Sequence, residues 1–364
     1  MDSGLWTQDS GLRTQDSGLR TQDSGLRTQD SGLRTQDSGY NYALNAVKFL
    51  MSVIIVIYHY NFFLLGWNSN ILFRGGYICV DAFFVISGFM CAKVLLSLSR
   101  ETSFFSWLKR RLMTLYPYYI AALIPAVCTG VYLNGFHGMR RVIAILEELV
   151  MIQEWGIINC FPYYNGATWY ISAMMFVSCV YFFLSKKFTP KIQAYIIAAL
   201  SALCFSVIVI KYGHIHVHGV IRRVVSLGIM RGFAGMGVGW LVFTFRDNIR
   251  LKYPGAIFAL SVIMLVSVCL YTKNTYADIL IYLAAAAVII SSRGIDVKPV
   301  MLQRMMIFSG KMSYALYLCH GFVQGIMFHF LHDYTLSAFM AVSLAVSFSM
   351  MVIVGKIQRH VTPQ

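Results

Sequence analysis

A histidine, His59, lies in the middle of the apolar run VIIVIYHYNFF, which covers residues 53–63. An imidazole inside hydrocarbon needs a polar partner or a watery cavity, and ionisable groups in membrane spans are costly and commonly functional. Lys48 precedes His59 by about three helical turns, so both side chains share one helix face with roughly 16 Å between them. The pattern indicates a cation near one end of a span and a base deeper in it. A Lys48 that merely reaches toward the membrane interface fits equally well.

Asp81 is the carboxylate that lies well inside an apolar run, in the segment RGGYICVDAFFVISGF of residues 74–89. Because this segment follows a short outer loop, its carboxylate could contact His59 and fix the imidazole tautomer, as carboxylates do for catalytic histidines. The alternative is a structural ion pair between Asp81 and a buried basic group. Arg231 is one such group inside another apolar run.

The composition identifies the class of protein in which these residues lie. Of the 364 residues 58% are apolar and 12% are charged, and the mean hydropathy is +0.63. This is too apolar for a soluble domain. We predict an all-α polytopic membrane helix bundle of about ten transmembrane helices. Their expected ranges are 41–64, 76–99, 115–134, 167–185, 191–212, 225–245, 254–272, 277–292, 314–332 and 335–355.

The net charge of +15 comes from 30 Lys and Arg residues, whose positions separate topology from nucleic-acid binding. With a cytoplasmic N-terminus most of them fall on the inner side, which is the positive-inside pattern. We therefore expect both termini in the cytoplasm and no nucleic-acid partner. The eight cysteines are scattered without metal-ligand spacing, so neither a zinc site nor a disulfide framework is expected.

Residues 2–39 repeat the heptapeptide DSGLRTQ, with Trp6 in place of Arg in the first copy. Each unit offers one Leu and one Gly, and therefore no paired apolar seam for a coiled coil. We predict a disordered low-complexity tail over 1–39, a membrane domain over 40–358 and a short cytoplasmic tail over 359–364. The heptanucleotide GACTCAG, read in tandem through all three frames, encodes this unit. We therefore expect a DNA repeat whose changes in length switch expression on and off, which is phase variation.

Four further stretches have residue types that favour particular roles. The basic cluster at 109–111 suits phosphate groups, and equally a topology anchor. HIHVH at 214–218 lacks a neighbouring carboxylate or cysteine, so we expect an outer loop and no metal. The glycines of GFAGMGVG at 232–239 include a GxxxG spacing that favours close helix packing. The stretch 140–155 is expected to be an outer surface helix over the site.

Five motifs together resemble the acyltransferase 3 family of integral membrane O-acyltransferases: YALNAVKFLMSVIIVIYHY, GGYICVDAFFVISGF, WLKRRLMTLYPYY, TWYISAMMF and SGKMSYALYLCH. The resemblance runs from about residue 40 to the last span. It implies transfer of an acetyl group from acetyl-CoA to a hydroxyl of a surface glycan such as lipopolysaccharide O-antigen, capsule or exopolysaccharide. The acceptor would be a glycan or a lipid-linked sugar, membrane lipids would surround the bundle, and the location would be a bacterial inner membrane.

The resemblance also assigns roles to residues. His59 matches the catalytic histidine that ends the family's Arg-x10-His motif, and Lys48 stands where the family has Arg. Arg111 matches the first Arg of an R-x-x-R motif, whose second Arg is replaced by Thr114. Lys48 and Arg111 are therefore expected to bind acetyl-CoA, with Asp81 orienting His59.

Three residues of later motifs, Trp169, Tyr317 and His320, are expected to line the site. His59 would act as a general base or form a transient acyl-histidine. The competing interpretation is a transporter or permease that uses intramembrane His59, Asp81 and Lys48 to relay protons or bind a solute.

Overall fold

The computed structural model describes residues 41–66, 72–135, 138–157, 164–217, 220–221, 225–270 and 275–361. The chain divides into two units, Met1–Asn41 and Tyr42–Gln364. The heptapeptide repeat predicted to be a disordered tail lies outside the described residues. All helices and strands described below belong to the second unit.

Helices make up nearly all of the described part of the second unit, which confirms the predicted all-α class. A two-stranded antiparallel ladder pairs Val220 with Ser226 and Ile221 with Val225. The α-helices are α2 (Tyr42–Leu65), α3 (Cys79–Ser97), α4 (Phe104–Asn134), α5 (Met139–Leu149), α6 (Trp169–Lys187), α7 (Pro190–Tyr212), α8 (Leu227–Phe245), α9 (Pro254–Leu270), α10 (Thr275–Ser292), α11 (Val300–Leu331) and α12 (Leu336–Val361), the 3-10 segments are η1 (Gly76–Ile78), η2 (Gly166–Thr168) and η3 (Arg246–Asn248), and the strands are β1 (Val220–Ile221) and β2 (Val225–Ser226).

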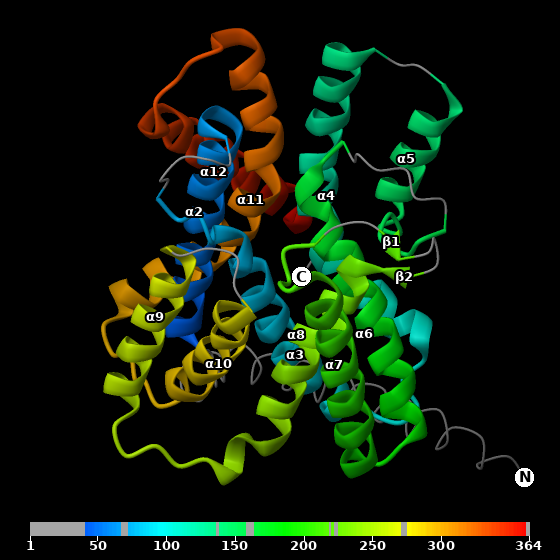
Figure 1. Cartoon of the computed structure of the whole chain (residues 1–364), viewed down its shortest axis with the longest axis vertical. Helices are drawn as coiled ribbons and strands as arrows, with labels where there is room; N and C mark the ends of the chain where they lie inside the picture. Colours follow the sequence, from blue (N-terminus) through cyan, green and yellow to red (C-terminus); the bar gives the residue numbers. More distant parts are fainter. Residues whose placement is uncertain are drawn as a thin grey trace, which may run out of the picture. The chain divides into compact units, whose positions relative to one another are not determined.

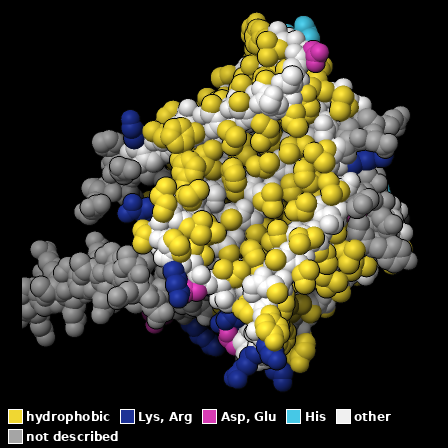
Figure 2. Space-filling model, turned by 90° about the vertical axis from the view of Figure 1, so that its left-hand side faces the viewer, with side chains coloured by type: hydrophobic (Ala, Val, Ile, Leu, Met, Phe, Trp, Pro, Cys, Tyr) yellow, Lys and Arg dark blue, Asp and Glu magenta, His cyan; other side chains and the backbone are white. Residues whose placement is uncertain are grey.

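Each of the ten predicted spans coincides with one of these helices, and α5 is the expected additional helix. Among the described residues, seven helices are long and apolar enough to cross a membrane, and α9 and α10 are apolar but shorter. The count of ten is therefore approximate, whereas the membrane helix bundle is confirmed. Figure 2 shows a broad hydrophobic face with Lys and Arg side chains gathered near its lower edge. Such a face suits contact with lipid.

Two helices are longer than the sequence pattern predicted. α4 begins at Phe104, because the Ser103 side chain accepts a hydrogen bond from the Ser106 N–H at 3.2 Å and caps the helix. α11 begins at Val300, one residue after Pro299. The additional turns mix charged and polar residues with apolar ones, so they escape a hydropathy window. In α4 these turns carry the basic cluster at 109–111.

The helices α3 and α8 lie side by side in the middle of the bundle (Figure 1) and share its most extensive helix contact. Glycines make this contact close. A Cβ on Gly88 of α3 would overlap the Met236 backbone, and a Cβ on Gly239 of α8 would overlap the Val85 carbonyl oxygen. The Cβ position of Gly235 is likewise only 2.6 Å from a side-chain carbon of α3. The predicted packing role of the GxxxG spacing is confirmed.

We predict that Gly239→Ala lowers the stability of the bundle by about 1–3 kcal/mol, since the new methyl group must push α3 and α8 apart. The measurement is the thermal unfolding midpoint of the purified protein in detergent. Gly355→Ala in α12 is the matched control, because no atom lies within 4 Å of its Cβ position. Equal midpoints for the two variants would contradict the role of the α3–α8 contact.

Candidate active site

A cavity of about 570 Å³ opens among α2, α3, α4, α6 and α11. Near the junction of α3 and α4 its wall includes Leu98, Trp107 and Arg110, and farther along it includes Tyr170 and Tyr317. None of its lining residues in the described part of the chain is acidic. The polar lining residues are Lys48, Ser87, Trp107, Arg110, Arg111, Thr114, Tyr170, Ser313, Tyr314 and Tyr317.

Three of the predicted site residues, Lys48, Arg111 and Tyr317, meet at this cavity. Within the described residues the Nε of Arg111 is buried without a hydrogen-bond partner. Lys48 is fixed through its backbone, because its carbonyl oxygen accepts a hydrogen bond from Ser313 Oγ at 2.9 Å. Ser313 Oγ also lies 2.8 Å from Ser52 Oγ, so α11 holds the turn of α2 that carries Lys48. Cations without acidic neighbours make the cavity suitable for an anionic ligand.

The histidines His59 and His320 lie beside each other, with ring centroids 4.8 Å apart. His59 Nδ1 is 3.0 Å from the Ile55 carbonyl oxygen, and His320 Nδ1 is 2.7 Å from the Tyr317 carbonyl oxygen. A carbonyl oxygen can only accept, so each Nδ1 donates and each neutral ring keeps its lone pair on Nε2. Two backbone carbonyls therefore set the tautomer that was expected to depend on a carboxylate.

Tyr317 connects the cavity to the two imidazoles. Its ring lies 6.0 Å from the His320 ring and 5.7 Å from the Tyr170 ring, centroid to centroid. Its hydroxyl donates to the Ala167 carbonyl oxygen at 2.8 Å. The lining residue Tyr317 is thus about one helical turn from His320, while neither imidazole is part of the cavity wall.

Asp81 is paired with Arg231 and not with His59, which corrects the expected contact. Arg231 Nη2 donates to Asp81 Oδ2 at 2.7 Å, and Arg231 Nε donates to Oδ1 at 3.2 Å. Both side chains are at most 1% exposed, and Tyr282 completes the set with a 3.5 Å hydrogen bond. The structural alternative of a buried ion pair is the one confirmed. The planar guanidinium can satisfy both carboxylate oxygens, which one imidazole cannot.

Trp169 was predicted to line the site, but it contacts the ion pair instead. The Arg231 guanidinium carbon lies 4.8 Å from the Trp169 ring centroid, and Phe84 packs at 5.9 Å on the same indole. Trp169 begins α6, so its ring reaches α8 at the level of Arg231. A cation–π contact in a dry interior lowers the cost of burying the guanidinium.

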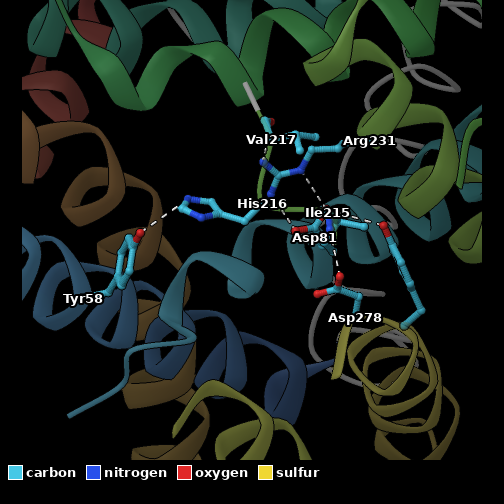
Figure 3. Close-up of polar contacts among 8 residues, drawn as sticks. Tyr58, Asp81, Ile215, His216, Val217, Arg231 and Asp278 are labelled. Atoms are coloured by element: carbon cyan, nitrogen blue, oxygen red, sulfur yellow. Dashed lines mark hydrogen bonds and ion pairs between the residues drawn. The ribbon is translucent and has the colours of Figure 1, made fainter. Parts of the chain in front are cut away.

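Residues 213–217, which follow α7, run into the bundle, where two side chains hold the backbone of this segment (Figure 3). The Ile215 N–H donates to Asp278 Oδ2 of α10 at 2.8 Å. Arg231 Nη1 donates to the Val217 carbonyl oxygen at 3.5 Å. The segment is therefore tied to α10 and to the Asp81–Arg231 pair.

His216 of this segment lies against two tyrosines. Its ring stacks on Tyr77 with centroids 4.0 Å apart, and its Nε2 lies 3.4 Å from the Tyr58 hydroxyl. Tyr58 precedes His59 in α2, so the segment comes close to the predicted catalytic histidine.

A loop was expected at 214–218, and residues 213–217 form one, but Ile215 and Val217 of this loop are buried. His218 lies outside the described residues, and among the described residues no group of three His, Cys, Asp or Glu side chains could hold a metal ion. The sequence signal for this burial was the alternation of apolar residues with histidines in HIHVH. The apolar residues Ile215 and Val217 are buried, and His216 between them stacks on Tyr77.

Glu148 lies in the stretch 140–155 that was expected to be a surface helix, but α5 ends at Leu149 and buries this carboxylate. Its side chain is fully buried and accepts hydrogen bonds from the N–H groups of Tyr164 and Asn165, the latter at 3.1 Å. Asn165 Nδ2 in turn donates to the Leu318 carbonyl oxygen at 3.1 Å. Glu148 therefore fixes the segment that precedes η2, whose Ala167 carbonyl receives the hydroxyl of the cavity tyrosine on α11.

The fold and the site together define a class of protein: a multi-pass membrane protein with a basic cavity that leads toward two adjacent imidazoles. The family model described as an acyltransferase domain matches residues 41–355. The chain belongs to this family, acyltransferase 3, and is a membrane acyltransferase. Comparisons with curated proteins and with solved structures found no match.

We predict that Asp81→Asn destabilises the protein by about 3–5 kcal/mol, because it leaves the Arg231 charge buried without its counter-ion. Combining it with Arg231→Gln should recover part of this loss, since the uncompensated charge is gone. Thermal midpoints of the wild type, both single variants and the double variant give the coupling. Strictly additive effects would show that the ion pair does not stabilise the fold.

Glu148 should make stability depend on pH. Burial raises its pKa from 4.5 to about 7, although hydrogen bonds from Asn165, Tyr164 and Thr168 oppose the shift. The pKa of Glu148 is higher in the folded state than in the unfolded state, so protonated Glu148 favours folding. This contribution is fully present below pH 4.5, and on the order of 3 kcal/mol of the free energy of unfolding is lost as the pH rises from there through 7. Glu148→Gln should remove this pH dependence of stability, whereas Glu101→Gln at an exposed position should leave it unchanged. Identical pH profiles of the thermal midpoint in all three proteins would rule the effect out.

Proposed function

We propose that this acyltransferase moves an acetyl group from acetyl-CoA to a hydroxyl of a surface glycan such as O-antigen, capsule or exopolysaccharide. The observation that carries the proposal is the basic cavity that approaches the His59–His320 pair. The proposed location is a bacterial inner membrane with both termini in the cytoplasm, as the distribution of Lys and Arg indicates. The acceptor is a glycan or lipid-linked sugar that arrives from the other side.

The cavity has the features that an acyl-CoA donor needs. Arg110, Arg111 and Lys48 supply positive charge for the phosphate groups. Between them and Tyr317 the wall is largely apolar, with side chains of α3 such as Ile86 among its residues. Such a wall suits the less polar arm that carries the thioester. A CoA molecule whose phosphates stay near the basic end would therefore present its acyl group toward the histidines.

In the general-base form of the reaction, His59 Nε2 takes the proton from the acceptor hydroxyl while the oxygen attacks the thioester carbonyl. The tetrahedral intermediate then expels the CoA thiolate, which receives a proton as the thiol. In the acyl-histidine form, Nε2 itself attacks the thioester carbonyl and the CoA thiolate leaves. The acceptor oxygen later attacks the acyl-imidazole, which gives the ester, the free imidazole and a proton from the hydroxyl. Trapping of an acetylated enzyme in a single turnover without acceptor separates the two forms.

His216 and Tyr58 lie near His59 on the side from which we propose that the acceptor arrives. The Tyr58 ring lies 5.1 Å from the His59 ring, and His216 contacts Tyr58 from the segment between α7 and α8. His216 is therefore a candidate for contact with an acceptor that approaches His59 from outside. Asp81 acts on the site as a positioning residue, since its partner Arg231 donates to a backbone carbonyl of the same segment.

The proposal of phase variation rests on the coding property of the repeat in residues 2–39. Seven nucleotides are not a multiple of three, so the gain or loss of one unit shifts the frame before the first span. Expression would then vary among sibling cells, and glycan acetylation would vary with it.

His59→Ala should lower acetyl transfer at least ~100-fold, the range expected for loss of a general base, while the protein stays in the membrane. The measurement is release of CoA together with mass spectrometry of the acceptor glycan. His329→Ala on α11 is the control, since it removes an exposed imidazole nine residues beyond His320 on the same helix. Wild-type turnover in the His59 variant would sink the catalytic assignment.

Lys48→Ala should raise the KM for acetyl-CoA roughly tenfold, the loss of one charge-assisted contact, with a smaller effect on kcat. Lys48→Arg should keep the KM near the wild-type value, because the guanidinium retains the charge and adds a planar fork. Lys93→Ala on the exposed side of α3 is the matched control. If all four proteins share one KM, Lys48 only anchors the helix at the interface.

A further inference from the structure

Two cysteines far apart in the sequence meet at one end of the bundle. Cys79 Sγ and Cys269 Sγ lie 3.4 Å apart, although 190 residues separate them. Both side chains are 0% exposed. The adjoining backbones are also fixed to each other, because the Gly75 N–H donates to the Cys269 carbonyl oxygen at 2.9 Å. This contact fixes both chain segments at the level of the thiols.

The two thiols lie at matching ends of their helices. Cys79 is the first residue of α3, and Cys269 is the last but one of α9. With a cytoplasmic N-terminus, α3 begins and α9 ends on the outer side of the membrane. The pair therefore lies at the face of the bundle that borders the oxidising compartment, where disulfides form and persist.

We propose that Cys79 and Cys269 form a disulfide in the membrane-inserted protein. The inference rests on the orientation given under the proposed function. The oxidant is a protein disulfide of a dithiol oxidase on the outer face. One cysteine thiolate attacks that disulfide, and the second cysteine thiolate resolves the mixed disulfide. Two electrons pass to the oxidase, which leaves as a dithiol, and two protons are released from the cysteines to its sulfurs.

The timing of this oxidation follows from burial. In the folded bundle neither sulfur is accessible to an oxidase. The reaction must therefore take place after α9 crosses the membrane and before the end of α9 packs against η1. The bond would close a very long loop, for which the effect on the unfolded chain is largest. It would also hold the start of α3 two residues from Asp81, and thereby the position of the Asp81–Arg231 pair.

Differential alkylation of the full chain tests the proposal. Membranes are quenched in acid, free thiols are blocked with N-ethylmaleimide under denaturing conditions, and the sample is reduced and treated with iodoacetamide. Cys79 and Cys269 should carry carbamidomethyl groups, and the unreduced digest should contain their linked peptides. Cys319 is the internal control, since the contact of its sulfur is with Met350 Sδ at 3.7 Å. Maleimide on Cys79 and Cys269 at the level found on Cys319 would overturn the proposal.

Two variants separate the disulfide from simple packing of thiols. Cys79→Ser should make Cys269 react with maleimide, and Cys269→Ser should do the same for Cys79. Reduction should lower the thermal midpoint of the wild type by on the order of 5 °C. It should not change the midpoint of the double variant that carries both Cys79→Ser and Cys269→Ser. A midpoint that does not respond to reduction in the wild type counts against the bond.

The orientation is measured separately, with an impermeant maleimide on spheroplasts that carry Asp333→Cys or Asp247→Cys at exposed positions, each compared with the wild-type background. Labelling of the first variant alone supports the proposed orientation, and free thiols at Cys79 and Cys269 then overturn the disulfide by itself. Labelling of the Asp247→Cys variant alone overturns both the proposed orientation and the disulfide. The acetyl-transfer assay is independent of either result.

Discussion

Two opposite charges, Asp81 and Arg231, are buried between α3 and α8, and the arrangement of the bundle depends on this pair. Removing two ions from water is expensive, and the cost is offset only where geometry and further hydrogen bonds are good. Here the guanidinium meets both carboxylate oxygens, Tyr282 adds a third hydrogen bond, and Trp169 covers the cation. The pair is therefore possible only where α3, α6, α8 and α10 all come together.

The glycines of the α3–α8 contact let the backbones approach closely enough for the pair to form. Arg231, Gly235 and Gly239 recur every four residues, so they share one face of α8. The Cβ position of Gly235 is 3.2 Å from the Asp81 carbonyl oxygen, which shows that the same face meets α3 at the ion pair. Farther along α3, a serine hydroxyl lies 2.6 Å from the Tyr170 hydroxyl at the cavity. The α3–α8 contact thus fixes one wall of the cavity as well as the core.

The sequence predicted the elements better than the contacts between them. Hydropathy sums over a whole span, so the ten apolar ranges each coincide with a helix. The first turns of α4 and α11, which mix polar with apolar residues, carry no such signal and were missed. The cavity contacts of Lys48 and Arg111 agree with their motif positions, whereas the partner of Asp81 lies 150 residues away and has no local signature. Glu148 was likewise hidden, because one carboxylate in an amphipathic helix looks solvent-exposed until its partners are known.

The cations and the two imidazoles occupy different parts of the bundle, and this division is compatible with acyl transfer. The cations face the cavity, where an anionic donor would bind. The imidazoles lie beyond Tyr317, and two backbone carbonyls fix their protons on Nδ1 without any carboxylate. A carboxylate beside His59 would favour the imidazolium and lower the supply of neutral base. Because Arg231 holds Asp81 instead, the acidic group in the first turn of α3 is paired with a guanidinium and not with the His59 imidazole.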